Sequence, residues 1–198
     1  MRAKKIIVVL SVCLAACAPL KPALEAPENK KMPIEARKKQ TSKVSAWDIK
    51  GAMSAKYKNN GWSASLNWHQ QGANNYKLRL FGPLGGGSVV ISKHGQVVTY
   101  QDGADKESST NAAQLLQRKT GIKLPVNNLY FWVRGISAPG SVQAASYDEY
   151  NHLKTLKQAG YTINYVRYTS VNGTDLPSKI SLQGHGVSIK LVIKSWTL

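Results

Sequence analysis

Side chains that could do chemistry are few and scattered in this sequence. The four histidines lie far apart, without the spacing of a metal site on one helix: His69, His94, His152 and His185. Seven carboxylates fall within residues 46–198, mostly in expected loops: Asp48, Asp102, Asp105, Glu107, Asp148, Glu149 and Asp175. That distribution is typical of a solvated surface rather than of an acid–base pair. Residues 85–88 (Gly-Gly-Gly-Ser) lack the lysine of a phosphate loop, and no Gly-x-Ser-x-Gly elbow occurs. The sequence therefore predicts no enzyme, no metal and no cofactor.

One thiol, that of Cys17, is placed for a defined modification. A basic start at residues 2–5 leads into an apolar run at residues 6–16, which is too short to cross a ~30 Å hydrocarbon core as a helix. The run ends in Leu-Ala-Ala-Cys, typical of a bacterial lipobox, where small residues precede the cut and the cysteine takes a diacylglycerol. We predict that residues 1–16 are a removed signal peptide and that Cys17 is the lipid attachment site. The alternative is an ordinary secretory signal followed by an incidental cysteine.

The cysteines also bear on disulfides and on destination. Cys13 lies in the segment expected to be removed, and Cys17 would carry lipid, so the mature chain has no thiol left to pair. Ala18, not Asp, follows the lipidated residue. By the sorting rule of enteric bacteria this favours the outer membrane.

The chain is strongly basic, with a formal net charge of +17. Export argues against a nucleic-acid partner. An anionic membrane surface is the better candidate, since it attracts each nearby basic residue by roughly 1 kcal/mol. The alternative is that the charge is dispersed and only keeps the protein soluble. No dense basic cluster in the sequence decides between the two.

Residues 17–45 are predicted to be the lipidated cysteine and a flexible tether. Four prolines, at positions 19, 22, 27 and 33, stand among Lys, Glu and Ala without an apolar period. About twenty such residues span roughly 25 Å, which would let a folded body stand just off the membrane. A short helix over about residues 36–46 would lead into that body.

Residues 46–198 are predicted to form one β-rich domain with a core of its own. Apolar and polar side chains alternate, as at residues 62–69, where every even position is apolar. Other strands are expected at about residues 47–56, 76–80, 86–92, 96–101, 150–157, 161–165, 178–183 and 187–193. Short links rich in Gly and Asn separate them, so we expect an antiparallel sheet that curls around a single interior.

Two stretches break this pattern and are predicted to be helices. Thr110–Thr120 has helical spacing, a possible cap at Thr110 or Asn111 and a stop at Gly121. Pro125–Arg134 has apolar residues on one side. Since their apolar faces must be covered, we expect this pair to close the open mouth of the sheet.

The sequence resembles the LolB family of outer-membrane lipoprotein receptors over about residues 47–197. One stretch, residues 76–85, reads Tyr-Lys-Leu-Arg-Leu-Phe-Gly-Pro-Leu-Gly, and another, residues 129–135, reads Leu-Tyr-Phe-Trp-Val-Arg-Gly. Further matches fall at residues 47–51, 62–71, 115–118, 121–125, 138–140, 158–161, 176–177 and 189–196. Two departures occur: Ile136-Ser137 stands where the family often has Leu-Pro, and Tyr161 stands where a tryptophan is expected.

The resemblance implies an incomplete, half-open antiparallel β-barrel with a short helical lid over an apolar cavity, as in LolA and LolB. It implies a monomer that receives cargo lipoproteins from the periplasmic carrier LolA and places them in the inner leaflet of the outer membrane. The protein itself would be anchored on the periplasmic face. At Pro83, Leu84 and Gly85 the resemblance places a membrane-insertion loop, whose apolar residue enters the target membrane. The alternative is a Leu84 folded back onto the core.

An apolar cavity is what such cargo requires. A sixteen-carbon chain exposed to water costs on the order of 12 kcal/mol, at ~0.8 kcal/mol per methylene. The inward-facing residues predicted to line the acyl-chain cavity are Trp62, Leu66, Trp68, Leu78, Leu80, Leu129, Trp132, Ile163, Tyr165, Ile189 and Leu191. The alternative for each is ordinary core packing, because a hollow and a filled barrel share one alternation pattern. A structural envelope lipoprotein that scaffolds another complex is the second class of function, and an enzyme acting on lipids is the third.

Overall fold

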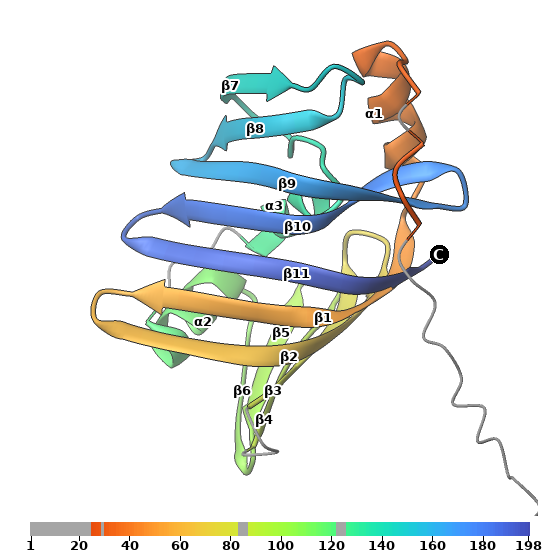
Figure 1. Ribbon diagram of the computed structural model, residues 1–198. Coiled ribbons are helices and arrows are strands. Elements are labelled where there is room, and N and C mark those ends of the chain that lie inside the picture. The colour runs from red at the N-terminus through yellow and green to blue at the C-terminus, as the bar shows by residue number, and fades with distance from the viewer. Residues whose placement is uncertain (1–24, 29, 83–86, 122–125) are drawn as a thin grey trace, which may run out of the picture.

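A computed structural model describes residues 25–28, 30–82, 87–121 and 126–198. Within these ranges, eleven strands form one antiparallel sheet (Figure 1). The strands are β1 (Ala46–Tyr57), β2 (Asn60–Gln71), β3 (Asn75–Phe81), β4 (Ser88–His94), β5 (Val97–Asp102), β6 (Asp105–Ser109), β7 (Val142–Tyr147), β8 (Leu153–Gln158), β9 (Tyr161–Val171), β10 (Thr174–Gly184) and β11 (Val187–Thr197). Their order is β6-β5-β4-β3-β2-β1-β11-β10-β9-β8-β7, so β1 and β11 pair at the centre.

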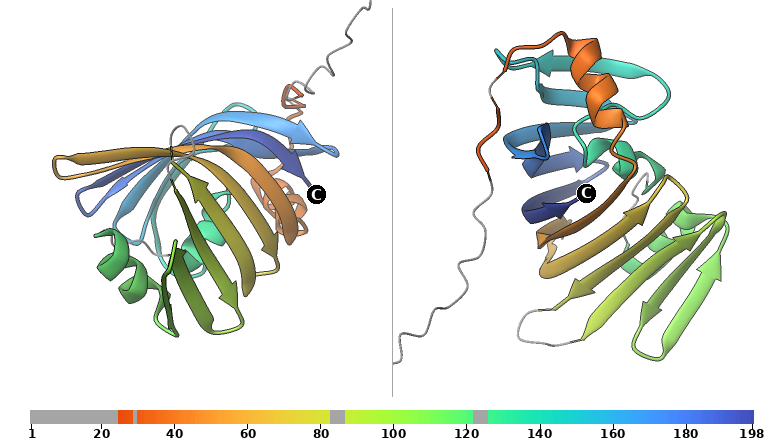
Figure 2. Two further views of the ribbon diagram at one scale, coloured as in Figure 1. Left: turned by 90° about the horizontal axis from the view of Figure 1, so that it is seen from below. Right: turned by 90° about the vertical axis from the view of Figure 1, so that its right-hand side faces the viewer.

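The sheet curves strongly but does not close into a barrel (Figure 2): β6 and β7 lie at its two edges and do not pair with each other. The predicted incomplete antiparallel barrel is therefore confirmed. A bulge between Lys50 and Gly51 shifts the register of β1 against β11. A side chain at Gly51 would clash with the carbonyl oxygen of Val192, so only glycine allows this close approach of the two central strands.

Two helices lie on the concave side of the sheet, as predicted (Figure 2). Helix α2 (Ala112–Thr120) begins at Asn111, whose side chain accepts a hydrogen bond from the N–H of Gln114 at 3.0 Å. It ends at Gly121, which has the left-handed φ of 73° that favours glycine. Helix α3 (Val126–Trp132) follows it in the chain.

The core has two parts. The larger cluster joins the central strands to α3 and includes Ile49, Leu66, Trp132, Ile163 and Ile193. The smaller cluster packs α2 against β4 and β5 and consists of Ile91, Val98, Tyr100, Leu115 and Leu116. The apolar face of each helix is therefore covered by the sheet, as the alternation of the strands and the spacing of the helices predicted.

The flexible tether predicted over residues 17–45 is too long. Residues 17–24 lie outside the part of the chain that the structure describes, but from Glu25 onward the segment packs on the body. Glu25 pairs with Ser170 of β9, and helix α1 (Ile34–Ser42) buries Arg37 and Thr41. Composition suggested a solvated chain because the buried group that holds this segment is a charged arginine rather than an apolar side chain.

Two strands were missed and one was misplaced. In β7 every position is exposed, and β6 carries Asp105, Lys106 and Glu107, so neither shows the alternation of a half-buried strand. The strand predicted at 150–157 begins only at Leu153, because Asn151 adopts a left-handed φ of 65° in a turn that precedes it.

Candidate functional site

An apolar cavity lies between the concave face of the sheet and the two helices. Its volume is about 150 Å³. Since roughly 10–15 Å³ of such space holds one water, the interior is a real hollow rather than a packing defect. Strands β1 to β4 and β9 to β11 supply one side, and α2 and α3 supply the other.

Ten of the eleven predicted cavity residues line this single hollow. They are Trp62, Leu66, Trp68, Leu78, Leu80, Leu129, Trp132, Ile163, Ile189 and Leu191. The structure brings them together from β2, β3, α3, β9 and β11.

Tyr165 does not belong to this lining, which corrects the prediction. It shares the inward face of β9 with Ile163, but the hollow ends before it. Its ring instead packs near that of Tyr168, with 6.2 Å between ring centroids. Complete burial raises the pKa of its hydroxyl well above the ordinary value. Alternation gave the correct face but could not give the length of the cavity.

Several lining residues were not predicted. Met53 of β1 and Ile180 and Leu182 of β10 extend the wall of the sheet, and Leu116 and Tyr130 come from the helices. The signal for Ile180 and Leu182 was present, since they alternate within a predicted strand. Met53 stands opposite both Ala64 and Leu191 in register, a position that sequence alone does not reveal.

Three of the polar side chains in the lining, Gln70, Thr120 and Asn127, have hydrogen-bond partners. The amide of Gln70 accepts from the indole N–H of Trp68 at 2.8 Å, and the hydroxyl of Thr120 donates to the carbonyl of Leu116 at 2.6 Å. Asn127 accepts from the ammonium of Lys93 at 3.4 Å. Burial raises the pKa of Tyr76, another lining residue, to about 12. A hollow lined mainly by apolar side chains has little to offer water, so it suits an apolar ligand.

The lid helix α3 is fastened by polar contacts behind the cavity. The side-chain oxygen of Gln158 accepts from the indole N–H of Trp132 and from the backbone N–H of Ala138, both at 2.9 Å. The guanidinium of Arg134 donates to the carbonyls of Tyr130 and Val44 at 2.9 and 2.7 Å. These contacts tie the end of α3 to β8 and to the chain that enters β1.

Arg134 also stacks on aromatic rings. Its guanidinium carbon lies 4.0 Å from the ring centroid of Tyr130 and 5.3 Å from that of Trp47, and those two rings stack on one another at 5.2 Å. Burial lowers the pKa of Arg134 from its ordinary value. The cation is stabilised by carbonyl oxygens and π faces. Sequence analysis did not identify Arg134 as a lid-holding residue.

Comparison with known proteins gives the family. The sequence profile described as "Outer membrane lipoprotein LolB" matches residues 45–196. The chain belongs to the LolB family. An outer-membrane lipoprotein LolB of Coxiella burnetii is 37% identical over 156 residues, covering 78% of this chain and 73% of that protein. One of Ectopseudomonas mendocina is 34% identical over 190 residues, covering 94% and 92%.

Solved structures show the same fold at low identity. A LolA superfamily protein from Nitrosomonas europaea has a TM-score of 0.52 at 8% identity, over 85% of this chain and 94% of that one. A putative outer membrane lipoprotein-sorting protein domain from Vibrio parahaemolyticus has a TM-score of 0.53 at 9% identity, over 82% and 89%. The overall fold of this LolB-family chain is thus shared with these two solved structures.

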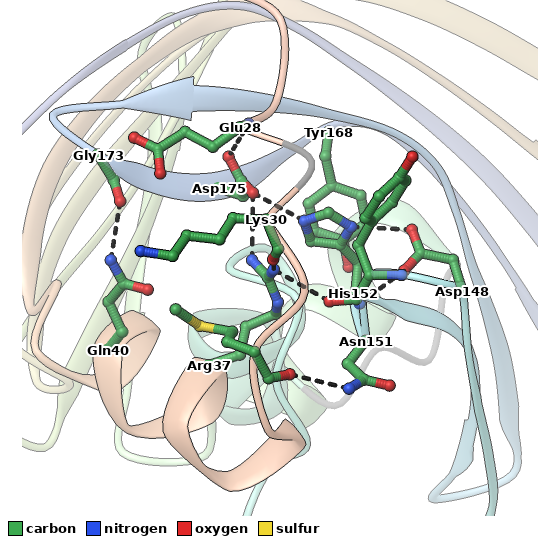
Figure 3. Close-up of polar contacts among 12 residues, drawn as sticks. Glu28, Lys30, Arg37, Gln40, Asp148, Asn151, His152, Tyr168, Gly173 and Asp175 are labelled. Carbon is green, nitrogen blue, oxygen red and sulfur yellow. Dashed lines mark hydrogen bonds and ion pairs between the residues drawn. The ribbon is translucent and has the colours of Figure 1, made fainter.

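A buried polar cluster holds the N-terminal segment of this LolB-family chain (Figure 3). Asp175 of β10 lies at its centre: its carboxylate contacts the guanidinium of Arg37 at 3.1 Å and the ring of His152 at 2.8 Å. The backbone N–H of Glu28 donates to the same carboxylate at 3.0 Å. The other ring nitrogen of His152 lies 2.8 Å from Asp148.

The pKa of Asp175 lies below its ordinary value. Burial alone would raise it, but the hydrogen bonds from His152 and Glu28, together with the charges of His152 and Arg37, outweigh burial and favour the carboxylate. Arg37 also donates to the carbonyls of Lys30 and Tyr150. Of the four histidines and seven carboxylates considered from sequence, His152 and Asp175 are thus buried in this cluster, although the carboxylates were expected mostly on a solvated surface.

Some predicted features lie outside the described residues. The signal peptide 1–16, Cys17 and the loop residues Pro83, Leu84 and Gly85 all belong to this group. Residues on either side of the loop are described: the N–H of Gly82 donates to the carbonyl of Gly87 at 3.2 Å, closing the hairpin of β3 and β4. Within the described ranges, no helix is long and apolar enough to cross a membrane, and no three His, Cys, Asp or Glu residues gather as a metal site.

Proposed function

We propose that this protein accepts lipoproteins from the periplasmic carrier LolA by binding their acyl chains in the apolar cavity, and inserts them into the inner leaflet of the outer membrane. It would do so as a monomer anchored through Cys17. The observation that carries the proposal is the cavity itself, a hollow lined by aromatic and aliphatic side chains in a fold shared with a putative outer membrane lipoprotein-sorting protein domain.

The direction of transfer follows from relative affinity. Moving a sixteen-carbon chain from one apolar cavity to another involves little net exposure, so no nucleotide is needed if the receptor binds more tightly than the donor. The bilayer is the final and most favourable acceptor. Stiff aromatic walls such as those of Trp62, Trp68 and Trp132 keep a hollow open without a ligand.

Release into the membrane would use the loop at Pro83, Leu84 and Gly85. It stands between the hydrogen-bonded ends of β3 and β4, and β3 itself lines the cavity with Leu78 and Leu80. In this proposal Leu84 enters the leaflet and brings the cavity wall close to the acceptor.

Acyl binding is tested with a dye-labelled acylated peptide. Met53→Trp adds bulk to the cavity and is expected to weaken binding by about tenfold or more, a loss of about 1.4 kcal/mol or more. Val192→Trp is the matched control, because Val192 is exposed on the neighbouring central strand. Equal binding by the Met53→Trp variant would place the acyl site elsewhere.

Delivery is tested separately with a loaded carrier and vesicles. Leu84→Glu is expected to leave peptide binding intact while cargo stops reaching the vesicles. The intrinsic fluorescence of the unmodified protein adds a third readout, since three of its five tryptophans line the cavity. A fluorescence signal that stays constant at saturating acylated peptide would contradict the proposal, and a co-purifying protein without lipid would favour a scaffold instead.

A further inference from the structure

Basic side chains gather on the outer, convex face of the sheet. Six exposed cations stand on four neighbouring strands, β1, β11, β10 and β9: Lys50, Lys56, Lys190, Lys194, Lys179 and Arg167. Each adjoins an inward residue along its strand, as Lys190 lies between Ile189 and Leu191 of the cavity wall. We call these six residues the outer basic face. Neighbouring strands are about 4.8 Å apart, so the four span roughly 15 Å.

Acidic residues do not balance this charge. The four strands contain two carboxylates: Asp48, which is paired with His69 at 2.9 Å, and Asp175, which is buried against Arg37 and His152. Among the residues that the structure describes, none of the six cations forms an ion pair with a carboxylate. Glu25 lies near Arg167 but forms no ion pair with it, so the outer basic face keeps a large excess of positive charge.

One pair on this face is unfavourable for folding. Arg167 stands directly opposite Lys179 in the register of β9 and β10. Like charges at such cross-strand positions are destabilising. A partner that neutralises these two charges would relieve this repulsion.

The side chains between the cations decide what kind of partner fits. Small residues lie between them: the polar Ser54, Asn164 and Ser181, and two exposed valines, Val166 and Val192. Protein interfaces need a buried apolar or aromatic centre and are depleted in lysine, and two separate valines among lysines do not form such a centre. A broad face of lysines over small side chains instead suits a diffuse layer of negative charge, which needs no shaped contact.

The path of the N-terminal segment favours the same face. It crosses β9 and β10 on the side opposite α3 (Figure 1), and Glu25 and Ala26 share a surface depression with Val166 and Arg167. Cys17 precedes Glu25 by eight residues, which span at most roughly 26–29 Å. A lipid at Cys17 would therefore hold the outer basic face close to the bilayer.

We propose that the outer basic face is a docking surface for the anionic headgroups of a lipid bilayer. It acts apart from acyl binding, since its side chains point away from the cavity. Electrostatic attraction to the headgroups extends over about 8–10 Å at moderate salt. Cations beside the outer basic face therefore contribute as well. Docking in this way leaves α2 and α3, on the concave side of the sheet, open to a carrier.

The test measures sedimentation of the full chain with vesicles, using Cys17→Ser so that no lipid anchor contributes. We expect binding to vesicles with about one-third phosphatidylglycerol, weak binding to pure phosphatidylcholine, and loss of binding as salt rises from ~0.1 M to ~1 M. Replacing Lys56, Lys179 and Lys190 by Gln should lower the partition coefficient on the order of 100-fold, at about fivefold per charge.

A control with the same loss of net charge tests whether the position of the lysines matters for vesicle binding. Lys39, Lys43 and Lys106 are exposed elsewhere, and their replacement by Gln should change binding only a few-fold. Equal losses in the two triple variants, or equal binding to both kinds of vesicle, would overturn the proposal. The proposal would also be overturned if the outer-face variant still bound vesicles but no longer bound the carrier, since the face would then serve a protein partner. Acylated-peptide binding should be unchanged in both variants, so a failure here is distinct from a failure of the cavity.

Discussion

The interior of this protein contains two regions built on opposite principles. The cavity under β1 to β4 and β9 to β11 is lined mainly by apolar side chains, and protein atoms do not fill it. The cluster around Asp175 is polar, and its carboxylate is surrounded by partners at 2.8 to 3.1 Å. Apolar surfaces hold any apolar guest without fixed geometry, whereas short polar contacts hold one arrangement.

The difference shows what each region can tolerate. A cavity wall is not in contact with neighbours on every side, so it can lose or shift a side chain at small cost. The polar cluster has charges removed from water, and each depends on the others. We expect substitutions in the cavity to change binding and substitutions in the cluster to change folding.

The largest effect is expected from Asp175→Ala. This change leaves Arg37 and His152 buried without their shared carboxylate, and breaking such a group typically costs about 3–5 kcal/mol. The free energy of unfolding from denaturant titration measures it. Asp48→Ala is the control, because Asp48 forms an exposed pair with His69 and should change stability by less than about 1 kcal/mol. Equal effects of the two changes would refute the contrast.

A second pair of variants compares filled and hollow packing. Leu176 is fully buried in the large core cluster, whereas Leu80 is partly exposed and lines the cavity. Leu176→Ala should cost about 2–5 kcal/mol, and Leu80→Ala should cost roughly 1 kcal/mol because less contact is lost. Thermal or chemical unfolding gives both values. A cost for Leu80→Ala as large as that for Leu176→Ala would mean that the cavity is closed in solution.

Sequence analysis predicted most of the named cavity residues but not the polar cluster, and the reason is physical. Alternation predicted the sheet, and ten cavity residues, because inward apolar side chains follow the strand period wherever one face is buried. It could not place the end of the hollow at Tyr165, which depends on how β9 lies against its neighbours. The link of Arg37 to Asp175 spans 138 positions, and no local pattern marks which charged residues will meet.

The same limit explains the missed edges and the N-terminal segment. β7 has no buried position, so its residues do not show a strand period although they pair with β8. Residues 25–45 look like a linker by composition, yet the backbone contacts of Glu25 and Glu28 and the side chain of Arg37 dock them. Pairing of backbone groups and of distant charges contributes little to a hydrophobicity pattern.

The smallest effect concerns pH and isolates the electrostatic part of the cluster. Because the pKa of Asp175 in the folded protein lies below its ordinary value of 3.8, ionised Asp175 adds stability that is complete above that value. This stability is lost as the pH falls through the lower, folded-state pKa. Asp175→Asn has no such group, so the difference in unfolding free energy between the unmodified protein and this variant should shrink on going from neutral pH to well below 3.8. Comparing the two proteins at each pH cancels the titration of the other carboxylates, since they are common to both. Hydrogen exchange of the α1 amides should follow the same course in the unmodified protein, because the cluster holds that helix. A difference that stays constant with pH would mean that Asp175 acts only through hydrogen bonds that its amide replacement also makes.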